Sequence, residues 1–83
     1  MQTKSQNSAV IWSQQGCVHC ETAYRILSTR GYHVDFRKIG EGEQYTKQDL
    51  LDVVPAARSV PQIFVNGEYV GDLTSLRKYL VVR

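Results

Sequence analysis

The first half of the chain switches between the periodicity of strands and that of helices. Residues 9–12 form a short apolar run that is typical of a buried strand. After a loop, apolar side chains from Cys20 to Leu27 recur at the spacing of one helix face, and Gly31 is a suitable C-terminal stop. Residues 33–38 then alternate in the manner of a second strand. This succession predicts a βαβ unit, with parallel strands and a right-handed crossover.

The second half of the chain predicts a helix, a hairpin and a final helix. Residues 45–54 carry leucine and valine at helical spacing, and a proline follows them. Residues 60–65 and 68–70 indicate two strands, joined by an Asn-Gly pair that is the strongest short signal for a hairpin turn. A last helix begins near residue 72, and its leucines share one face.

Together these elements predict one α/β domain with the order β-α-β-α-β-β-α. Two parallel strands and an antiparallel hairpin make a four-stranded mixed sheet, flanked by three helices because its strands are too apolar to face water. A chain of 83 residues allows one small domain, here residues 9–83, and we expect the polar residues 1–8 to form a flexible arm. We expect Trp12, Tyr24 and Tyr69 to pack in the core rather than stack on a ligand.

Composition and charge exclude several classes of protein. The hydrophobic share is 42% and the charged share is 22%, which is ordinary for a globular domain. A net charge of +2 is too small and too scattered for a nucleic-acid-binding surface, and no apolar run approaches the length of a membrane span. Residues 1–8 lack the apolar core of a secretory signal. We therefore expect a cytoplasmic protein with neither nucleic acid nor membrane as its partner.

Two cysteines, Cys17 and Cys20, stand at the junction between the first strand and the first helix. A disulfide scaffold uses more cysteines, spread along the chain. A structural zinc site needs about four ligands, and His19 and His33 supply no second pair, so we expect no metal site. Two cysteines that are simply buried in the core remain an alternative. In a βαβ setting, however, Cys-x-x-Cys is typical of a redox-active pair.

Three stretches of the sequence resemble the glutaredoxins, which have the thioredoxin fold. The three stretches are Cys17-Val18-His19-Cys20, Ser59-Val60-Pro61-Gln62-Ile63-Phe64 and Gly71-Asp72. The resemblance implies a thioredoxin-like architecture and a cis peptide bond between Val60 and Pro61. It also implies an enzyme that reversibly reduces protein disulfides and glutathione mixed disulfides. Such an enzyme uses glutathione as a co-substrate and holds no permanently bound cofactor.

The two cysteines are expected to have unequal roles. Cys17 stands at a helix start, where free N–H groups and the helix dipole stabilise a thiolate, so it is the predicted nucleophile. Cys20 lies one turn later on the apolar face and is the predicted resolving thiol. Between them, Val18 and His19 replace the proline and tyrosine that the family most often carries. An imidazole beside a thiolate favours the reduced form, so we expect His19 to make the redox couple more oxidising.

The same resemblance places glutathione in a groove beside Cys17. An extended peptide could pair with the backbone of Val60. The γ-glutamyl end would meet the start of the last helix, where Asp72 could bind the ammonium group, cap the helix, or do both. Arg58 would approach the glycine carboxylate unless it is only a solvated charge, and Gln14 stands where the family often has lysine. The predicted glutathione-binding residues are Gln14, Val18, Arg58, Ser59, Val60, Pro61, Gly71, Asp72, Leu73 and Thr74.

Three other functions remain open on the sequence. A similar redoxin could take electrons from thioredoxin reductase and pass them to ribonucleotide reductase. A glutathione-assisted iron–sulfur carrier would be a dimer, although its best-known members have a single active-site cysteine. A module that keeps the fold without activity ranks last because both thiols are present. We expect a monomer whose partners are glutathione and disulfide-bearing or glutathionylated proteins, with ribonucleotide reductase as one candidate.

Overall fold

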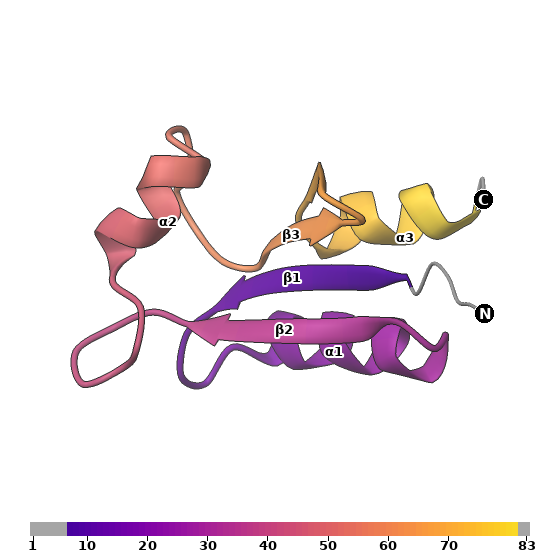
Figure 1. The fold of residues 1–83 in the computed structure, drawn as a ribbon, viewed down its shortest axis with the longest axis horizontal. Coiled ribbons are helices and arrows are strands. Elements are labelled where there is room, and N and C mark those ends of the chain that lie inside the picture. Colours follow the sequence, from indigo (N-terminus) through magenta and orange to yellow (C-terminus); the bar gives the residue numbers. More distant parts are fainter. Residues whose placement is uncertain (1–6, 82–83) are drawn as a thin grey trace, which may run out of the picture.

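The computed structural model describes residues 7–81 and confirms the predicted order of elements (Figure 1). The elements are β1 (Ser8–Ser13), α1 (Val18–Thr29), β2 (His33–Lys38), α2 (Lys47–Val53), β3 (Gln62–Val65), β4 (Glu68–Gly71) and α3 (Leu73–Val81). No helix within residues 7–81 is both long enough and apolar enough to cross a bilayer. The structure therefore has the α/β composition that the two periodicities of the sequence predict.

The four strands form one mixed sheet in the order β2-β1-β3-β4. β1 and β2 run parallel, as the βαβ unit requires, whereas β3 runs antiparallel to β1. β3 and β4 form the expected hairpin, whose register shifts by a bulge between Ile63 and Phe64. Asn66 and Gly67 in its turn have φ angles of 51° and 83°, which explains the Asn-Gly pair.

One face of the sheet is fully covered by α1 and α3. Ile11 and Ile63 from the sheet pack against Leu27 of α1 and Leu76 of α3, and all four side chains are completely buried. Figure 1 shows both helices behind the sheet, with α1 under β2 and α3 beside the hairpin. This face holds the main core, and Cys20 is part of it.

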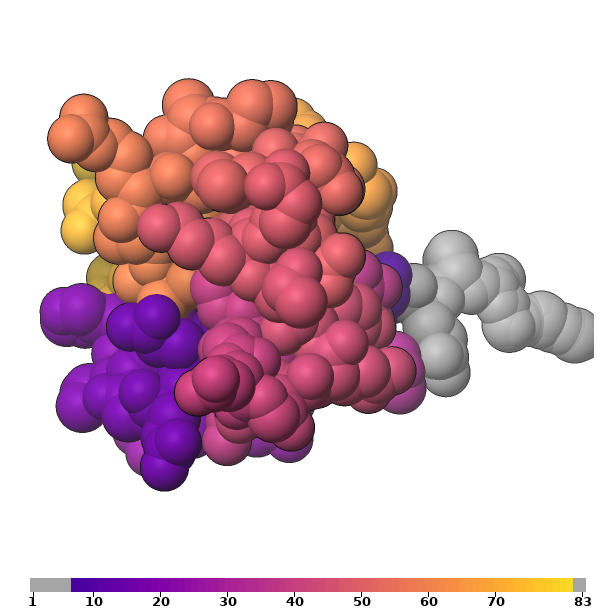
Figure 2. Space-filling view, turned by 90° about the vertical axis from the view of Figure 1, so that its left-hand side faces the viewer, coloured from indigo at the N-terminus to yellow at the C-terminus, as the bar shows by residue number. Residues whose placement is uncertain are grey.

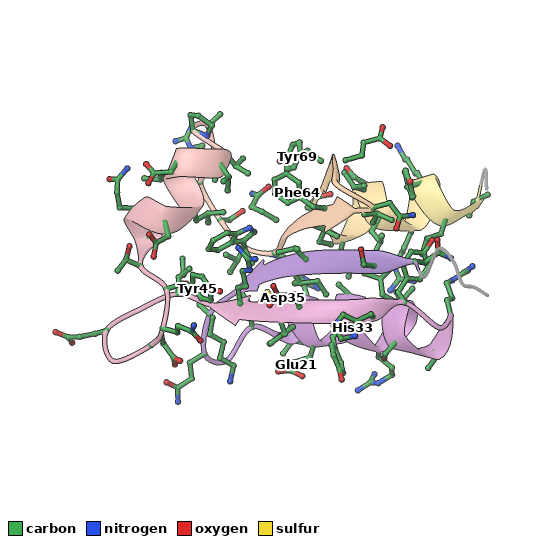
Figure 3. The ribbon with its side chains drawn as sticks, viewed as in Figure 1. Glu21, His33, Asp35, Tyr45, Phe64 and Tyr69 are labelled. Carbon is green, nitrogen blue, oxygen red and sulfur yellow. A yellow bond between two sulfur atoms is a disulfide. The ribbon has the colours of Figure 1, made fainter. Side chains whose placement is uncertain are left out.

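The opposite face is covered only at one end. Trp12 packs there against Leu50 and Val54 in a second, smaller cluster. In Figure 1, α2 stands at the left, beyond the ends of β1 and β3. Further along this face, Phe64 and Tyr69 lie side by side with ring centroids 5.3 Å apart, as Figure 3 shows. The expectation that helices cover both faces is therefore fulfilled only in part.

Two elements are shorter than the sequence predicted. The helix expected over residues 45–54 begins at Lys47, because the Thr46 hydroxyl accepts a hydrogen bond of 3.1 Å from Asp49 N and caps the helix. Tyr45 instead lies edge-on against the Trp12 ring. The third strand begins at Gln62 rather than at residue 60.

The expectations for two tyrosines and for the N-terminal arm need correction. Tyr24 is 43% exposed and only its edge contacts Phe36, so it is not a core residue. Tyr69 is 50% exposed, although its hydroxyl donates a hydrogen bond to the side-chain oxygen of the buried Gln62. The arm predicted over residues 1–8 ends earlier, since Ser8 already belongs to β1. The expected flexibility of residues 1–6 concerns a part of the chain outside the described residues.

Candidate active site

Three chain junctions meet at one edge of the sheet. β1 ends at Ser13, and the antiparallel β3 begins beside it, with Gln62 opposite Trp12. β4 ends at the same edge, since Gly71 lies opposite Ile63. The loop before α1, the segment before β3 and the turn before α3 therefore come together. Figure 2 looks onto this end, where the violet atoms that follow β1 lie directly beneath the orange atoms that precede β3.

Cys17 is the N-cap residue of α1. Its backbone is extended (φ −86°, ψ 103°), and its sulfur accepts a hydrogen bond of 3.1 Å from the backbone N–H of Cys20. The sulfur thus occupies the place that a serine or aspartate oxygen takes at other helix starts. An amide donor and the positive end of the helix dipole both favour a negatively charged sulfur here.

Cys20 lies one turn further along and forms a disulfide with Cys17. Its side chain has no exposed surface, whereas Cys17 is only partly buried. The Cys20 sulfur also lies 4.0 Å from the carbonyl oxygen of Trp12 at the end of β1. An incoming disulfide can reach Cys17 but not Cys20, which is the inequality that the helical spacing predicts.

One hollow lies between α1 and the start of α3, and we call it the α3 hollow. Its volume is about 260 Å³. Its lining consists of His19, Ser59, Val60, Pro61, Asp72, Leu73 and Thr74. The bond between Val60 and Pro61 is cis, as the resemblance implied. The structure thus gathers six of the predicted glutathione-binding residues, together with His19, around one depression.

Asp72 is the N-cap of α3. Its carboxylate accepts a hydrogen bond of 2.9 Å from the backbone N–H of Ser75, and its carbonyl accepts one from Leu76 N. The backbone amide and then the hydroxyl of Ser75 hold the pKa of the Asp72 carboxyl below its ordinary value. Gly71, just before it, has a φ of +116°, a conformation that side chains rarely adopt. This glycine turn aims the first turn of α3 at the hollow.

A second hollow of about 290 Å³ adjoins the first, and we call it the α2 hollow. It is lined by Gln14, Ile39, Lys47, Leu50, Leu51, Ala57, Arg58, Ser59 and Val60. Ser59 and Val60 line both hollows, so the two lie next to each other, and we call them together the trough. Gln14 and Arg58 lie in this second part, whereas Val18 is 73% exposed and lines neither.

Comparison with known proteins decides the family. A protein-family model described as Glutaredoxin matches residues 9–70. The chain belongs to the glutaredoxin family. Mouse glutaredoxin-2, a mitochondrial protein, is 34% identical over 73 residues, covering 84% of this chain and 46% of that protein. The chain spans about half the length of the curated glutaredoxins that it matches.

Solved glutaredoxins have the same fold as this chain. Reduced glutaredoxin of Escherichia coli superposes with a TM-score of 0.75 at 24% identity, over 92% of this chain and 95% of that one. A buckwheat glutaredoxin, solved as a complex with glutathione, gives 0.73 at 20% identity, over 92% of this chain and 70% of that one. These likenesses confirm the predicted thioredoxin-like architecture.

The site of this glutaredoxin contains one charged residue that the sequence reasoning missed. Lys47 lines the α2 hollow beside Gln14 and Arg58, although it is far from both in sequence. The only indication in the sequence of where Lys47 lies was the capping pattern at Thr46, which marks the start of α2. Among residues 7–81, no group of three or more His, Cys, Asp and Glu side chains is placed to hold a metal ion.

Proposed function

We propose that this chain is a glutathione-dependent thiol-disulfide oxidoreductase. The observation that carries the proposal is the Cys17 sulfur, which caps α1 between Gln14, a lining residue of the α2 hollow, and His19, a lining residue of the α3 hollow. The membership of the glutaredoxin family supports it, as does the buckwheat glutaredoxin with the same fold, which is described as a complex with glutathione.

With a glutathione mixed disulfide, the Cys17 thiolate attacks the glutathione sulfur. The bond between that sulfur and the substrate sulfur breaks, and the substrate leaves as a thiolate that takes up a proton. A second glutathione, as its thiolate, then attacks the sulfur of the bound glutathione. Oxidised glutathione leaves, and Cys17 returns to its thiolate form, stabilised by the Cys20 amide.

With a protein disulfide, both cysteines take part. Cys17 forms a mixed disulfide with the substrate, and the Cys20 thiolate then attacks the Cys17 sulfur and releases the second substrate thiol. The product on the enzyme is the Cys17–Cys20 disulfide, which is the state of the pair in this structure. Two glutathione molecules restore the dithiol and leave as oxidised glutathione.

The protein substrates and the compartment belong to the same proposal. Disulfide-bearing or glutathionylated proteins are the substrates, with electron transport to ribonucleotide reductase as one such role. A cytoplasmic location suits the reaction, because the second half-reaction needs a pool of reduced glutathione. Glutathione is a co-substrate and not a resident group, and the active form is a monomer.

The decisive experiment is the turnover of the mixed disulfide between glutathione and 2-mercaptoethanol. The reaction is coupled in one assay to glutathione with glutathione reductase, and in a second assay to thioredoxin reductase alone. We expect turnover in the first assay. Turnover in the second assay alone would overturn the proposal in favour of a redoxin reduced by thioredoxin reductase. Colour after anaerobic purification would instead support an iron–sulfur carrier.

A further inference from the structure

The outer edge of β2 carries backbone groups that the sheet does not use. β2 is the first strand in the sheet order, and among residues 7–81 no strand lies on its outer side, as Figure 1 shows. The N–H groups of His33 and Ile39 donate on the β1 side. Because the backbone groups of successive residues in a strand point to opposite sides, Val34 and Phe36 direct their N–H and C=O groups outward. Such a row of groups is a template for a further strand.

This free edge ends at a small hollow. Gly40 N also points outward, but it donates to Tyr45 O at 3.0 Å, so Tyr45 occupies the edge beside Ile39. The hollow has a volume of about 180 Å³, and its lining is Phe36, Lys38, Glu43, Gln44 and Tyr45. A strand added to β2 therefore has room opposite residues 34–38. Its side chains opposite Phe36 and Lys38 would point to the face on which these two residues border the hollow.

The side chains along the edge define the chemistry of the added strand. Asp35 and Arg37 stand on one face of β2 and keep part of their surface exposed, whereas Phe36 stands between them on the other face. The Phe36 ring lies 5.5 Å from that of the exposed Tyr24, so an apolar side chain opposite Phe36 would cover both rings. Opposite charges that face each other across two strands are stabilising and like charges are destabilising. A cation opposite Asp35 and an anion opposite Arg37 therefore complete the pattern.

A second copy of the chain has this pattern but does not fit the edge. β2 itself has an acidic, an apolar and a basic residue in succession, so two antiparallel copies paired at Phe36 would satisfy both charges. That register would set His33 of one copy opposite Ile39 of the other. Tyr45 already lies beside Ile39 on this edge. The occupant that fits is a short extended segment whose ends turn away from the sheet.

We propose that the outer edge of β2, from Val34 to Lys38, binds an extended segment of a partner protein as an antiparallel strand. From its N-terminal end the segment has an acidic, an apolar and a basic residue, which lie opposite Arg37, Phe36 and Asp35. The edge is separate from the trough, because none of residues 33–38 lines the α2 or the α3 hollow. The proposal therefore goes beyond the glutathione reaction and does not depend on it.

The test titrates short capped peptides into the isotope-labelled full chain and follows backbone amide shifts by NMR. A peptide with the central sequence Glu-Val-Lys should shift the amides of Val34 and Phe36. Exchanging its Glu and Lys sets like charges opposite each other and should weaken binding about tenfold. N-methylation of the valine removes the N–H group that faces Phe36 and should abolish binding. N-methylation of the lysine, whose N–H points away from β2, should be tolerated.

A charge reversal on the protein tests the same register from the other side. Asp35→Lys should weaken the binding of the Glu-Val-Lys peptide about threefold, and a Glu-Val-Glu peptide should restore it. Glu68→Lys is the matched control, because Glu68 is an exposed acidic residue on β4, at the opposite edge of the sheet. It changes the net charge by the same amount and should keep the affinity of wild type.

Three results would overturn the proposal. The first is binding that ignores both the exchange of charges and the position of the N-methyl group. The second is the absence of binding by every peptide, which would mean that the charges on β2 only keep other strands away from the edge. The third is self-association of the free chain through β2, which would make a second copy the occupant. A chain that binds the peptides as expected but lacks oxidoreductase activity would refute the proposed function and leave the docking edge intact.

Discussion

Replacing Gly71 by alanine tests the link between the start of α3 and glutathione binding. Gly71 has a φ of +116°, and a Cβ atom built on it would lie 3.2 Å from Ser75 Oγ and 3.3 Å from Ser75 Cβ. Ser75 is the residue whose backbone N–H bonds to Asp72. The methyl group would therefore strain the backbone and push against the first turn of α3 at once.

The two effects set the size of the expected change. A residue other than glycine in the left-handed region costs about 1–2 kcal/mol. Disturbing a helix N-cap costs about 1 kcal/mol, whereas the loss of flexibility in the unfolded chain returns about 0.4–1 kcal/mol. We expect Gly71→Ala to lower the free energy of unfolding by roughly 2 kcal/mol. A displaced α3 turn should raise the KM for the glutathione mixed disulfide about tenfold for each 1.4 kcal/mol of lost binding.

Urea unfolding and steady-state kinetics measure both quantities, and Gly31→Ala is the control. Gly31 has a φ of +87°, but a Cβ atom there would meet nothing within 4 Å. It follows the C-cap of α1, outside the two hollows. Gly31→Ala should lose about 1 kcal/mol and keep its KM. Equal losses of stability and an unchanged KM in both variants would refute the reasoning from the Ser75 contact.

Three further changes probe the cysteine pair and its surroundings. Cys17→Ser should abolish turnover of glutathione mixed disulfides, while Cys20→Ser should keep most of it and lose only the reduction of protein disulfides; a Cys17→Ser enzyme that stays active would contradict the assignment of the nucleophile. His19→Tyr should make the couple more reducing, measured by equilibration with glutathione buffers, and an unchanged potential would mean that His19 does not act on Cys17. Asp72→Asn keeps a capping side chain but removes the charge. Because the folded pKa of Asp72 is lowered, the stability advantage of wild type should be present above pH 4, roughly the unfolded pKa, and disappear as pH falls through the folded pKa. A wild-type advantage that is constant from pH 7 to pH 2 would exclude this origin.

The sequence predicted the elements whose signals are local. The strand over residues 33–38 matches β2 because Val34 and Phe36 alternate with polar residues, and the hairpin follows from residues that tolerate a positive φ. The inequality of Cys17 and Cys20 could also be predicted, since a helix start and its apolar face are read from spacing alone.

Aromatic residues were predicted less well, because burial depends on which face a neighbour covers. Trp12 is buried as expected, since α2 packs over it. Tyr69 stands on the same face of the sheet but beyond the reach of α2, and half of its surface remains exposed. A helix of seven residues cannot cover four strands, and the sequence pattern predicted a longer one.

The same helix contributes part of the candidate site, and its path explains why that part could not be predicted from the sequence. β2 ends at the edge where β1 ends, with Ile39 N donating to Ser13 O at 2.9 Å, so the chain leaves β2 beside the Cys17 loop. The following turn is closed by a hydrogen bond from Gly40 N to Tyr45 O, which returns the chain to the same edge just before α2. The first side chain of α2 therefore lies near Arg58, although ten residues separate them in sequence. The apolar spacing of α2 could be read from the sequence, but this return of the chain could not, so Lys47 could not be assigned to the trough before the structure was known.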